Sequence, residues 1–278
     1  MRQLIDELKD IKLAIFDLDG VVYRGKKLIK DTDKIIQELK DQNIRVVYNS
    51  NNSTATRQMY VERLENFNIL SDIHDFYTSA SITAEEISKV KSHARIFVIG
   101  EVGLREELKA KGHEIVNEPL NYNEIDFVIV GLDRNFNYKA LTTAQNCIME
   151  GNAEFYATNS DATLPAAKGF LPGAGVMVGA LEICTSKSPK KIFGKPNSYG
   201  IKLILKNNKV HAKNACIFGD RLETDILAGN RAGIYSIAVL TGVVSNDHIE
   251  ELKNNLKDKI DGNLLPDLVL DSLNDIFK

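Results

Sequence analysis

Two aspartates, Asp17 and Asp19, follow the first apolar segment of the chain. Residues 11–16 are apolar except for Lys12, which is typical of a buried strand in a parallel sheet. Residues i and i+2 of an extended chain point the same way, so we expect both carboxylates to face one spot. Carboxylates that close repel each other, and one keeps its proton unless a cation lies between them. The alternative is a turn capped by two solvated aspartates.

Three later strand ends carry chemically versatile side chains as well. These are Ser50, Asn51, Lys195, Asp220 and Asp225. If they converge with the first pair, the set holds several carboxylates, one ammonium and one hydroxyl. Carboxylate oxygens without a cluster of His or Cys suit Mg²⁺. The ammonium, the hydroxyl and a divalent ion together match a tetrahedral dianion, which is phosphate.

The two aspartates then have distinct chemical uses. Attack of an ionised Asp17 on phosphorus gives an aspartyl-phosphate and divides hydrolysis into two easier steps. Asp19 can protonate the leaving oxygen and later activate the water that attacks the intermediate. The pattern therefore favours phosphoryl transfer through a covalent intermediate.

The elements that must position these residues alternate between strand and helix. Strands are predicted at 11–16, 44–48 and 75–78, with helices at 31–41 and 54–66 between them. Further strands are predicted at 215–218, 235–240 and 266–270, with helices at about 198–206 and 223–232. This alternation indicates a doubly wound parallel α/β sheet, whose ligand site lies beyond the carboxyl ends of its strands.

The middle of the chain restarts the same alternation. Ser50 and Lys195 lie 145 positions apart, far more than the one or two strand–helix units that the sheet needs. We therefore predict a core of residues 1–80 and 190–278, and an inserted α/β domain of residues 81–189. Because the insert has its own predicted strands, it should form a second sheet.

Composition excludes several other classes of protein. The net charge of −3 gives no reason to expect nucleic acid or an anionic membrane as a partner. No apolar run is long enough to span a bilayer, and the first residues lack the apolar segment of a signal peptide. The three cysteines and five histidines are scattered, so a zinc site is not expected. A reducing, cytoplasmic location fits this cysteine usage.

Four motifs, in this order, resemble those of the haloacid-dehalogenase-like (HAD) phosphatases. They are FDLDGV at 16–21, SNNS at 50–53, FGKP at 193–196 and GDRLETD at 219–225. Each motif alone is weak, but the ordered set spans the chain. Ser50 stands where many members have Thr.

The resemblance implies a role for each matched position. Asp17 would be nucleophile and metal ligand, and Asp19 the general acid/base that also gives the metal a backbone oxygen. Ser50 and Asn51 would contact the phosphoryl oxygens, with Asn52 beside them, and Lys195 would neutralise charge. Asp220 would bind Mg²⁺ directly and Asp225 from the outer shell.

The insert resembles the α/β cap of the NagD-like members, which include p-nitrophenyl, pyridoxal phosphate and phosphoglycolate phosphatases. The segments concerned are 130–136, 157–161 and 171–175. Polar residues on these loops are candidate contacts to the leaving group, with turn formation as the alternative for each: Asp133, Arg134, Asn159 and Asp161. Ser160 stands where relatives usually have Pro. The resemblance also makes a homodimer through the cap conceivable.

A glycine run at 173–179 imitates a dinucleotide-binding sequence. Residues 168–172 make a poor strand, however, and no acidic residue follows on a second strand at the usual interval. We interpret the run as a tight turn and helix start where the insert rejoins the core.

The leading hypothesis is a Mg²⁺-dependent phosphatase acting on a small phosphorylated metabolite. A metal-independent dehalogenase would need neither Asp19 nor Asp220. A sugar phosphomutase of the family usually carries its cap earlier, where this chain has no room. A phosphate-binding or phospho-acceptor signalling protein would not need the insert. The sequence leaves the substrate open among sugar phosphates, nucleotides, pyridoxal phosphate, phosphoglycolate and glycerol phosphate.

Overall fold

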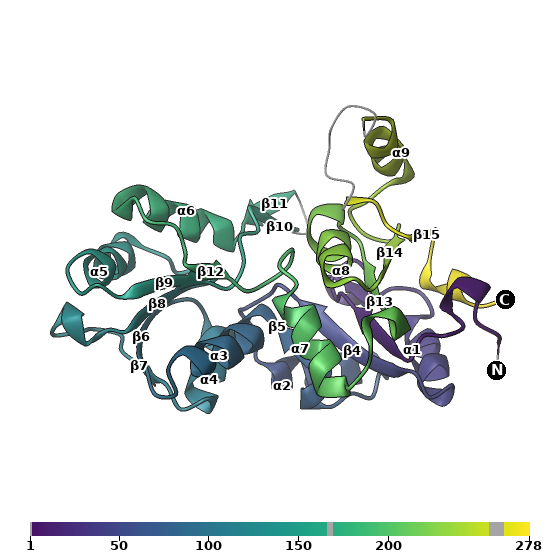
Figure 1. Cartoon of the computed structure of the whole chain (residues 1–278), viewed down its shortest axis with the longest axis horizontal. Coiled ribbons are helices and arrows are strands. Elements are labelled where there is room, and N and C mark those ends of the chain that lie inside the picture. The colour runs from purple at the N-terminus through teal and green to yellow at the C-terminus, as the bar shows by residue number, and fades with distance from the viewer. Residues whose placement is uncertain (1, 166–168, 256–263) are drawn as a thin grey trace. The chain divides into compact units, whose positions relative to one another are not determined.

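The computed structural model describes residues 2–165, 169–255 and 264–278, and the chain divides into two compact units (Figure 1). The core unit comprises Met1–Ser50, Val61–Tyr77 and Lys195–Lys278. The inserted unit comprises Asn51–Tyr60 and Thr78–Gly194. The predicted insert, 81–189, falls within the inserted unit but omits residues 78–80 and 190–194 at its two ends and the separate segment Asn51–Tyr60. These residues join the insert because their backbone pairs with it: the Gly103 N–H donates to the Thr54 carbonyl at 3.0 Å.

The core unit is built on a six-stranded sheet, in the order β15-β14-β13-β1-β4-β5, in which the five strands from β15 to β4 run parallel. The strands are β1 (Leu13–Phe16), β4 (Arg45–Ser50), β5 (Phe76–Thr78), β13 (Ala215–Gly219), β14 (Tyr235–Val239) and β15 (Leu268–Leu270). All four residues of β1 and all five of β13 are buried. The sheet is therefore covered on both faces, as continuous apolar strands require. The doubly wound α/β fold predicted from the sequence is confirmed.

The helices of the core sheet are α1 (Thr32–Asp41), α7 (Tyr199–Asn208), α8 (Leu227–Ala232) and α9 (Asn246–Asn255). α1 buries Ile35, Ile36 and Leu39, the positions whose helical spacing predicts it. The helix predicted at 223–232 is split: Leu222–Ile226 form a π-helical turn before α8. The short helices at the two termini are 3₁₀ turns, Asp6–Leu8 and Leu273–Ile276.

A second parallel sheet, in the order β12-β9-β8-β6-β7, organises the inserted unit. Its strands are β6 (Arg95–Ile99), β7 (Glu114–Ile115), β8 (Phe127–Val130), β9 (Glu154–Ala157) and β12 (Lys191–Ile192). Its helices are α3 (Ser79–Val90), α4 (Val102–Ala110), α5 (Tyr138–Met149) and α6 (Ala174–Thr185). α3 was not expected, because Thr, Ser and Ala give it little apolar periodicity. Its N-terminus is fixed by a capping box between Thr78 and Ser81. The helix α2 (Arg57–Glu65) contains residues of both units.

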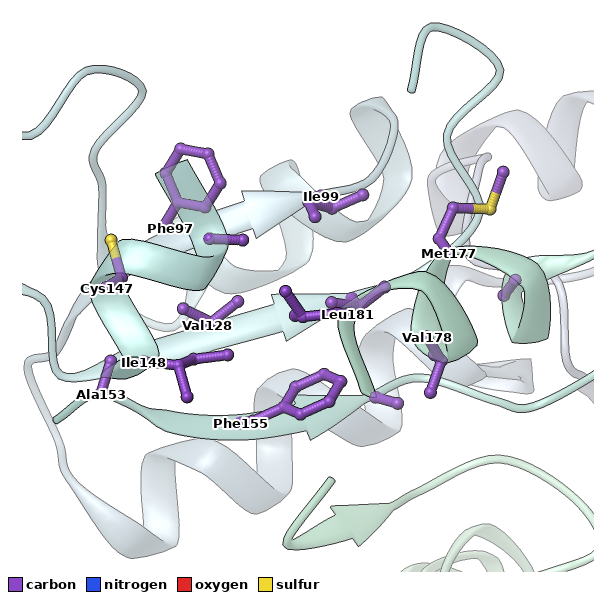
Figure 2. Close-up of a cluster of buried hydrophobic side chains, with 14 of the residues drawn as sticks. Phe97, Ile99, Val128, Cys147, Ile148, Ala153, Phe155, Met177, Val178 and Leu181 are labelled. Carbon is purple, nitrogen blue, oxygen red and sulfur yellow. The ribbon is translucent and has the colours of Figure 1, made fainter. Parts of the chain in front are cut away.

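One face of the inserted sheet packs against α5 and α6 (Figure 2). Val128 and Phe155 point into this cluster from neighbouring strands, and Ile148 and Leu181 reach it from the helices. Alternate strand residues such as Ile129 are buried on the opposite face. Burial on both faces explains why each strand reads as a continuous apolar run.

Two short hairpins complete the described chain: β2 (Tyr23–Arg24) with β3 (Lys27–Leu28), and β10 (Thr163–Pro165) with β11 (Phe170–Pro172). The glycine run at 173–179 does begin a helix, since α6 starts at Ala174. It does not mark the return to the core, which falls between Gly194 and Lys195. No helix in the described ranges is long and apolar enough to cross a membrane.

The packing of α6 predicts a marked contrast between two of its residues. Leu181 is fully buried, whereas Ile183 is 84% exposed. We expect Leu181→Ala to cost about 2–5 kcal/mol, because it removes buried methyl groups and leaves a cavity. The control Ile183→Ala should stay within about 0.5 kcal/mol of wild type. Urea unfolding followed by circular dichroism measures both, and equal losses would contradict the packing described.

Candidate active site

The order of the core sheet brings three predicted site residues to adjacent strand ends. β1 lies between β13 and β4, and Phe16 pairs with Phe218 on one side and Tyr48 on the other. Asp17 therefore follows β1 directly beside Asp220, which follows β13, while Ser50 ends β4. The chain turns in opposite directions from β1 and β13, so their carboxyl ends flank the switch point at which such sheets bind ligands.

Lys195, just before α7, joins two of the carboxylates. Its Nζ lies 2.6 Å from Asp17 Oδ1 and 2.5 Å from Asp225 Oδ1. Nζ also donates to the backbone carbonyl of Asn49 at 2.8 Å. All three charged side chains are buried, so each depends on the others for compensation of its charge.

Asp220 is held by a backbone loop that follows β14. Its Oδ2 accepts a hydrogen bond from the Val243 N–H at 2.9 Å. A Cβ atom at Gly242 would lie 1.9 Å from this oxygen, and one at Gly20 would lie 2.2 Å from it. Only glycine permits the two loops to approach the carboxylate so closely. Gly20 also has a φ of +91°, which disfavours a side chain independently.

The side chains at this edge of the sheet carry more negative than positive charge. Oxygen atoms of Asp17, Asp220 and Asp225 lie within 4.8 Å of one another. Burial raises the pKa of Asp17, the Lys195 ammonium opposes that rise, and the neighbouring carboxylates add to it. Burial and the charge of Asp225 likewise raise the pKa of Asp220, to about 6. Burial alone would lower the pKa of Lys195, but Asp17 and Asp225 outweigh it and raise that pKa.

The donor set fits a hard divalent cation. Three buried carboxylates with one contacting ammonium leave an excess of negative charge, and the ligand atoms are all oxygen. Such a set suits Mg²⁺ rather than a metal that prefers nitrogen or sulfur. The three cysteines are free and lie outside the group.

The Asp19 carboxylate does not lie with that of Asp17, contrary to the prediction from strand alternation. β1 ends at Phe16, and Leu18–Tyr23 form a turn in which the Tyr23 N–H donates to the Leu18 carbonyl. Strand alternation therefore does not extend to Asp19, and its carboxylate is outside the group of three. The side chain is exposed, yet loss of surrounding water raises its pKa, against the opposing charge of Arg63.

Sequence reasoning missed two neighbours of this loop and strand. Arg63 stacks over the Tyr23 ring at 4.0 Å and donates to the Gly25 carbonyl, so it holds the turn that carries Asp19. Asn49 supplies the carbonyl that Lys195 contacts, and its amide donates to Tyr77 O at 2.9 Å. The position of Asn49 within a buried strand was the available signal, because a buried polar side chain needs a partner.

The remaining candidates belong to the inserted unit. The side-chain oxygen Oδ1 of Asn52 accepts hydrogen bonds from the Thr54 N–H and hydroxyl, which shapes the loop after β4. Asp133 Oδ1 accepts from the Asn135 N–H. The Asn159 amide donates to the Asn51 carbonyl and to Thr158 Oγ1. These contacts within the unit account for the loop geometry, and substrate binding by these residues stays a prediction.

Comparison with known proteins agrees with this architecture. Residues 14–114 match the haloacid dehalogenase-like hydrolase family, and residues 192–276 match the related HAD-hydrolase-like family. The chain is 31% identical to the 5'-nucleotidase YutF of Bacillus subtilis, covering 88% of this chain and 93% of that protein. It is 33% identical to an acid sugar phosphatase of Staphylococcus haemolyticus, covering 88% and 90%.

Solved structures give the same result along nearly the whole chain. A p-nitrophenyl phosphatase from Archaeoglobus fulgidus aligns with a TM-score of 0.86 at 32% identity, covering 96% of this chain and 98% of that one. A 4-nitrophenylphosphatase from Thermotoga maritima has the same TM-score and identity, and covers 98% of both chains. The chain therefore belongs to the haloacid dehalogenase-like hydrolases, and it is an enzyme whose solved structural relatives are NagD-like p-nitrophenyl phosphatases.

Proposed function

We propose that this chain is a Mg²⁺-dependent phosphatase that hydrolyses a small phosphate monoester through an aspartyl-phosphate on Asp17. The observation that carries the proposal is the buried contact of Lys195 with Asp17, inside a group of three carboxylates at the switch point. A nucleophile there needs to be ionised and accessible to phosphorus. The ammonium at 2.6 Å favours the ionised form of Asp17.

The residues divide the reaction between them. Asp17 attacks phosphorus as the ester bond breaks, and Asp19 gives its proton to the departing oxygen. Asp19 then removes a proton from the water that attacks the acyl phosphate, which releases phosphate and regenerates Asp17. The exposed position of Asp19 and its raised pKa suit this exchange with leaving group and water. Lys195 and the Ser50 hydroxyl would offset charge on the phosphoryl oxygens.

Mg²⁺ would be held by Asp17, by Asp220 and, through the outer shell, by Asp225, with Asp19 giving a backbone oxygen. When bound, it supplies positive charge that offsets the phosphoryl group and the three carboxylates. The excess of negative charge in the group supports this assignment.

The proposed substrate is a small phosphorylated metabolite, with the inserted unit as the cap that selects it. Relatives of this chain are named for nucleotides, acid sugar phosphates, phosphoglycolate and p-nitrophenyl phosphate. Nucleic acid and membranes are not proposed as partners, and a cytoplasmic location and a homodimer stay predictions. A dehalogenase remains less well supported, because carbon–halogen cleavage does not need Asp220 or a metal.

The first test of this function is turnover of p-nitrophenyl phosphate by wild type and by Asp17→Asn. We expect Mg²⁺-dependent release of p-nitrophenol that EDTA abolishes, and a loss of at least about 10³-fold in kcat for the variant, because the amide cannot attack phosphorus. Asp41→Asn, an exposed position on α1, is the matched control and should keep full activity. Turnover that survives Asp17→Asn would contradict the proposed nucleophile.

The raised pKa of Asp220 gives a second prediction, for the metal-free protein. A folded-state pKa of about 6, above the ordinary value of 3.8 for an aspartate, means that this group's contribution to stability is complete only below pH 4. The contribution is lost as the pH rises through 6. In EDTA, Asp220→Asn should therefore raise the melting temperature at pH 8 and leave it nearly unchanged at pH 3.5.

When Mg²⁺ is added at pH 8, wild type should instead melt at a higher temperature than Asp220→Asn. Wild type gains stability from binding, and Asp220→Asn gains much less because a proposed ligand is gone. Differential scanning calorimetry measures the melting temperatures of both proteins in EDTA and in Mg²⁺. A variant less stable than wild type in EDTA at pH 8 would show that the carboxylates do not repel one another as described.

A further inference from the structure

Two of the four crossings between the two units lie next to predicted catalytic residues. The first falls between Ser50 and Asn51, and the second between Gly194 and Lys195. Ser50 and Lys195 can hold a phosphoryl group only if the residues joined to them are fixed. The contacts of Asn51 and Gly194 therefore bear on the proposed reaction, even though both residues belong to the inserted unit.

Asn51 is held from both its side chain and its backbone. Its amide nitrogen donates to Asp161 Oδ1 at 3.0 Å and to Asp161 Oδ2 at 3.1 Å. Its carbonyl accepts from the Ser79 hydroxyl at 2.6 Å and from the Asn159 amide at 2.9 Å. A hydrogen bond to an ionised carboxylate is roughly twice as strong as one between neutral groups. The bond to Asp161 is thus the charge-assisted contact of this set.

Asp161 is also held in place by contacts with residues other than Asn51. Its N–H donates to Asn159 Oδ1 at 3.1 Å, and its carbonyl accepts from the Gly175 N–H at 2.9 Å. A Cβ atom at Gly173 would lie 2.0 Å from that carbonyl, and one at Gly175 would lie 3.0 Å from it. The glycine run thus lets the loop after β9 lie directly on the start of α6, which orients Asp161 without help from Asn51.

The second crossing meets the same group of residues. The Gly194 N–H donates to the Thr158 carbonyl at 2.6 Å. A Cβ atom at Gly194 would lie 2.7 Å from Asn51 Oδ1 and 2.7 Å from the Thr158 carbonyl. The residues before Lys195 and after Ser50 are therefore packed against each other and against the loop that carries Asp161.

We propose that Asp161 is a positioning residue for the phosphatase reaction and acts through Asn51. It holds the Asn51 amide, and thereby the direction in which the chain leaves Ser50, in the arrangement that receives the phosphoryl group. The inference rests on the proposed function. Because a misplacement of about 1 Å at a reacting group can cost roughly 10²-fold in rate, loss of this contact should reduce catalysis without unfolding the unit.

The test is a double-mutant cycle with Asp161→Ala, Asn51→Ala and the double variant, assayed on p-nitrophenyl phosphate with Mg²⁺. We expect Asp161→Ala to lower kcat/KM by about 10- to 100-fold and to weaken inhibition by inorganic phosphate. Asp161→Asn keeps an oxygen that can accept the Asn51 amide, so it should recover most of the loss. The double variant should be no worse than Asn51→Ala, because residues that act as one unit are not additive.

Asp126→Ala is the matched control. This carboxylate of the inserted unit also accepts two hydrogen bonds, from the Lys91 ammonium and the Arg95 N–H, but it precedes β8 rather than following a strand. It should keep wild-type kcat/KM. Melting temperatures of all variants should stay close to wild type, and Asp161→Ser replaces Asp161→Ala in the cycle if the alanine variant does not melt cooperatively.

Two results would overturn the inference. Additive losses in the cycle would mean that Asp161 acts independently of Asn51, and an Asp161 truncation with wild-type kcat/KM would mean that it does not position the loop. Failure of the proposed function looks different, since wild type would then neither turn over the substrate nor bind phosphate by calorimetry.

Discussion

The core of this enzyme depends on the buried ammonium of Lys195. An isolated charge at this depth would cost far more than a small domain can supply, so it persists only with close partners. Asp17, Asp225 and the Asn49 carbonyl provide them, within 2.8 Å of Nζ. These partners come from the residue after β1, from the π-helical turn after β13 and from β4. One side chain thus ties three separate parts of the sheet edge to a single geometry.

The same edge carries more negative charge than the lysine offsets. Burial and mutual repulsion raise the pKa values of Asp17 and Asp220, which is unfavourable for the folded protein at neutral pH. Such an arrangement is common where a site binds a cation and an anionic substrate. Gly20 and Gly242 contribute to the burial of Asp220, because they bring backbone atoms close to its carboxylate. The fold keeps these carboxylates in place through packing rather than through charge balance.

The inserted unit uses glycine for a different purpose. Gly173 and Gly175 let the loop after β9 lie on the start of α6, and Gly194 lets the chain pass Asn51. The same close approach of two backbone segments explains why this region resembles a dinucleotide-binding sequence. Asn51, Asn159 and Asp161 hydrogen-bond to one another in these loops, so the effect that we propose for Asp161 would act through the position of the backbone.

The sequence by itself determined the sheet-forming segments and the positions of the chemical groups. Continuous apolar runs such as those before Asp17 and Asp220 are recognisable because burial on both faces removes any alternation. The order of strands and helices then places their ends at one edge. The motifs predicted which residues would gather there, and Asp17, Lys195, Asp220 and Asp225 do gather.

Only the tertiary structure decided how those groups meet. Asp19 leaves the group because β1 ends at Phe16 and a turn follows, a boundary that apolar periodicity does not locate. Asn51 and Asp161 are 110 residues apart, and a hydrogen bond over that distance leaves no local pattern in the chain. The limits of the inserted unit were missed at Asn51–Tyr60 for the same reason. Periodicity reports the burial of a residue, whereas the identity of a distant partner depends on how the whole chain packs.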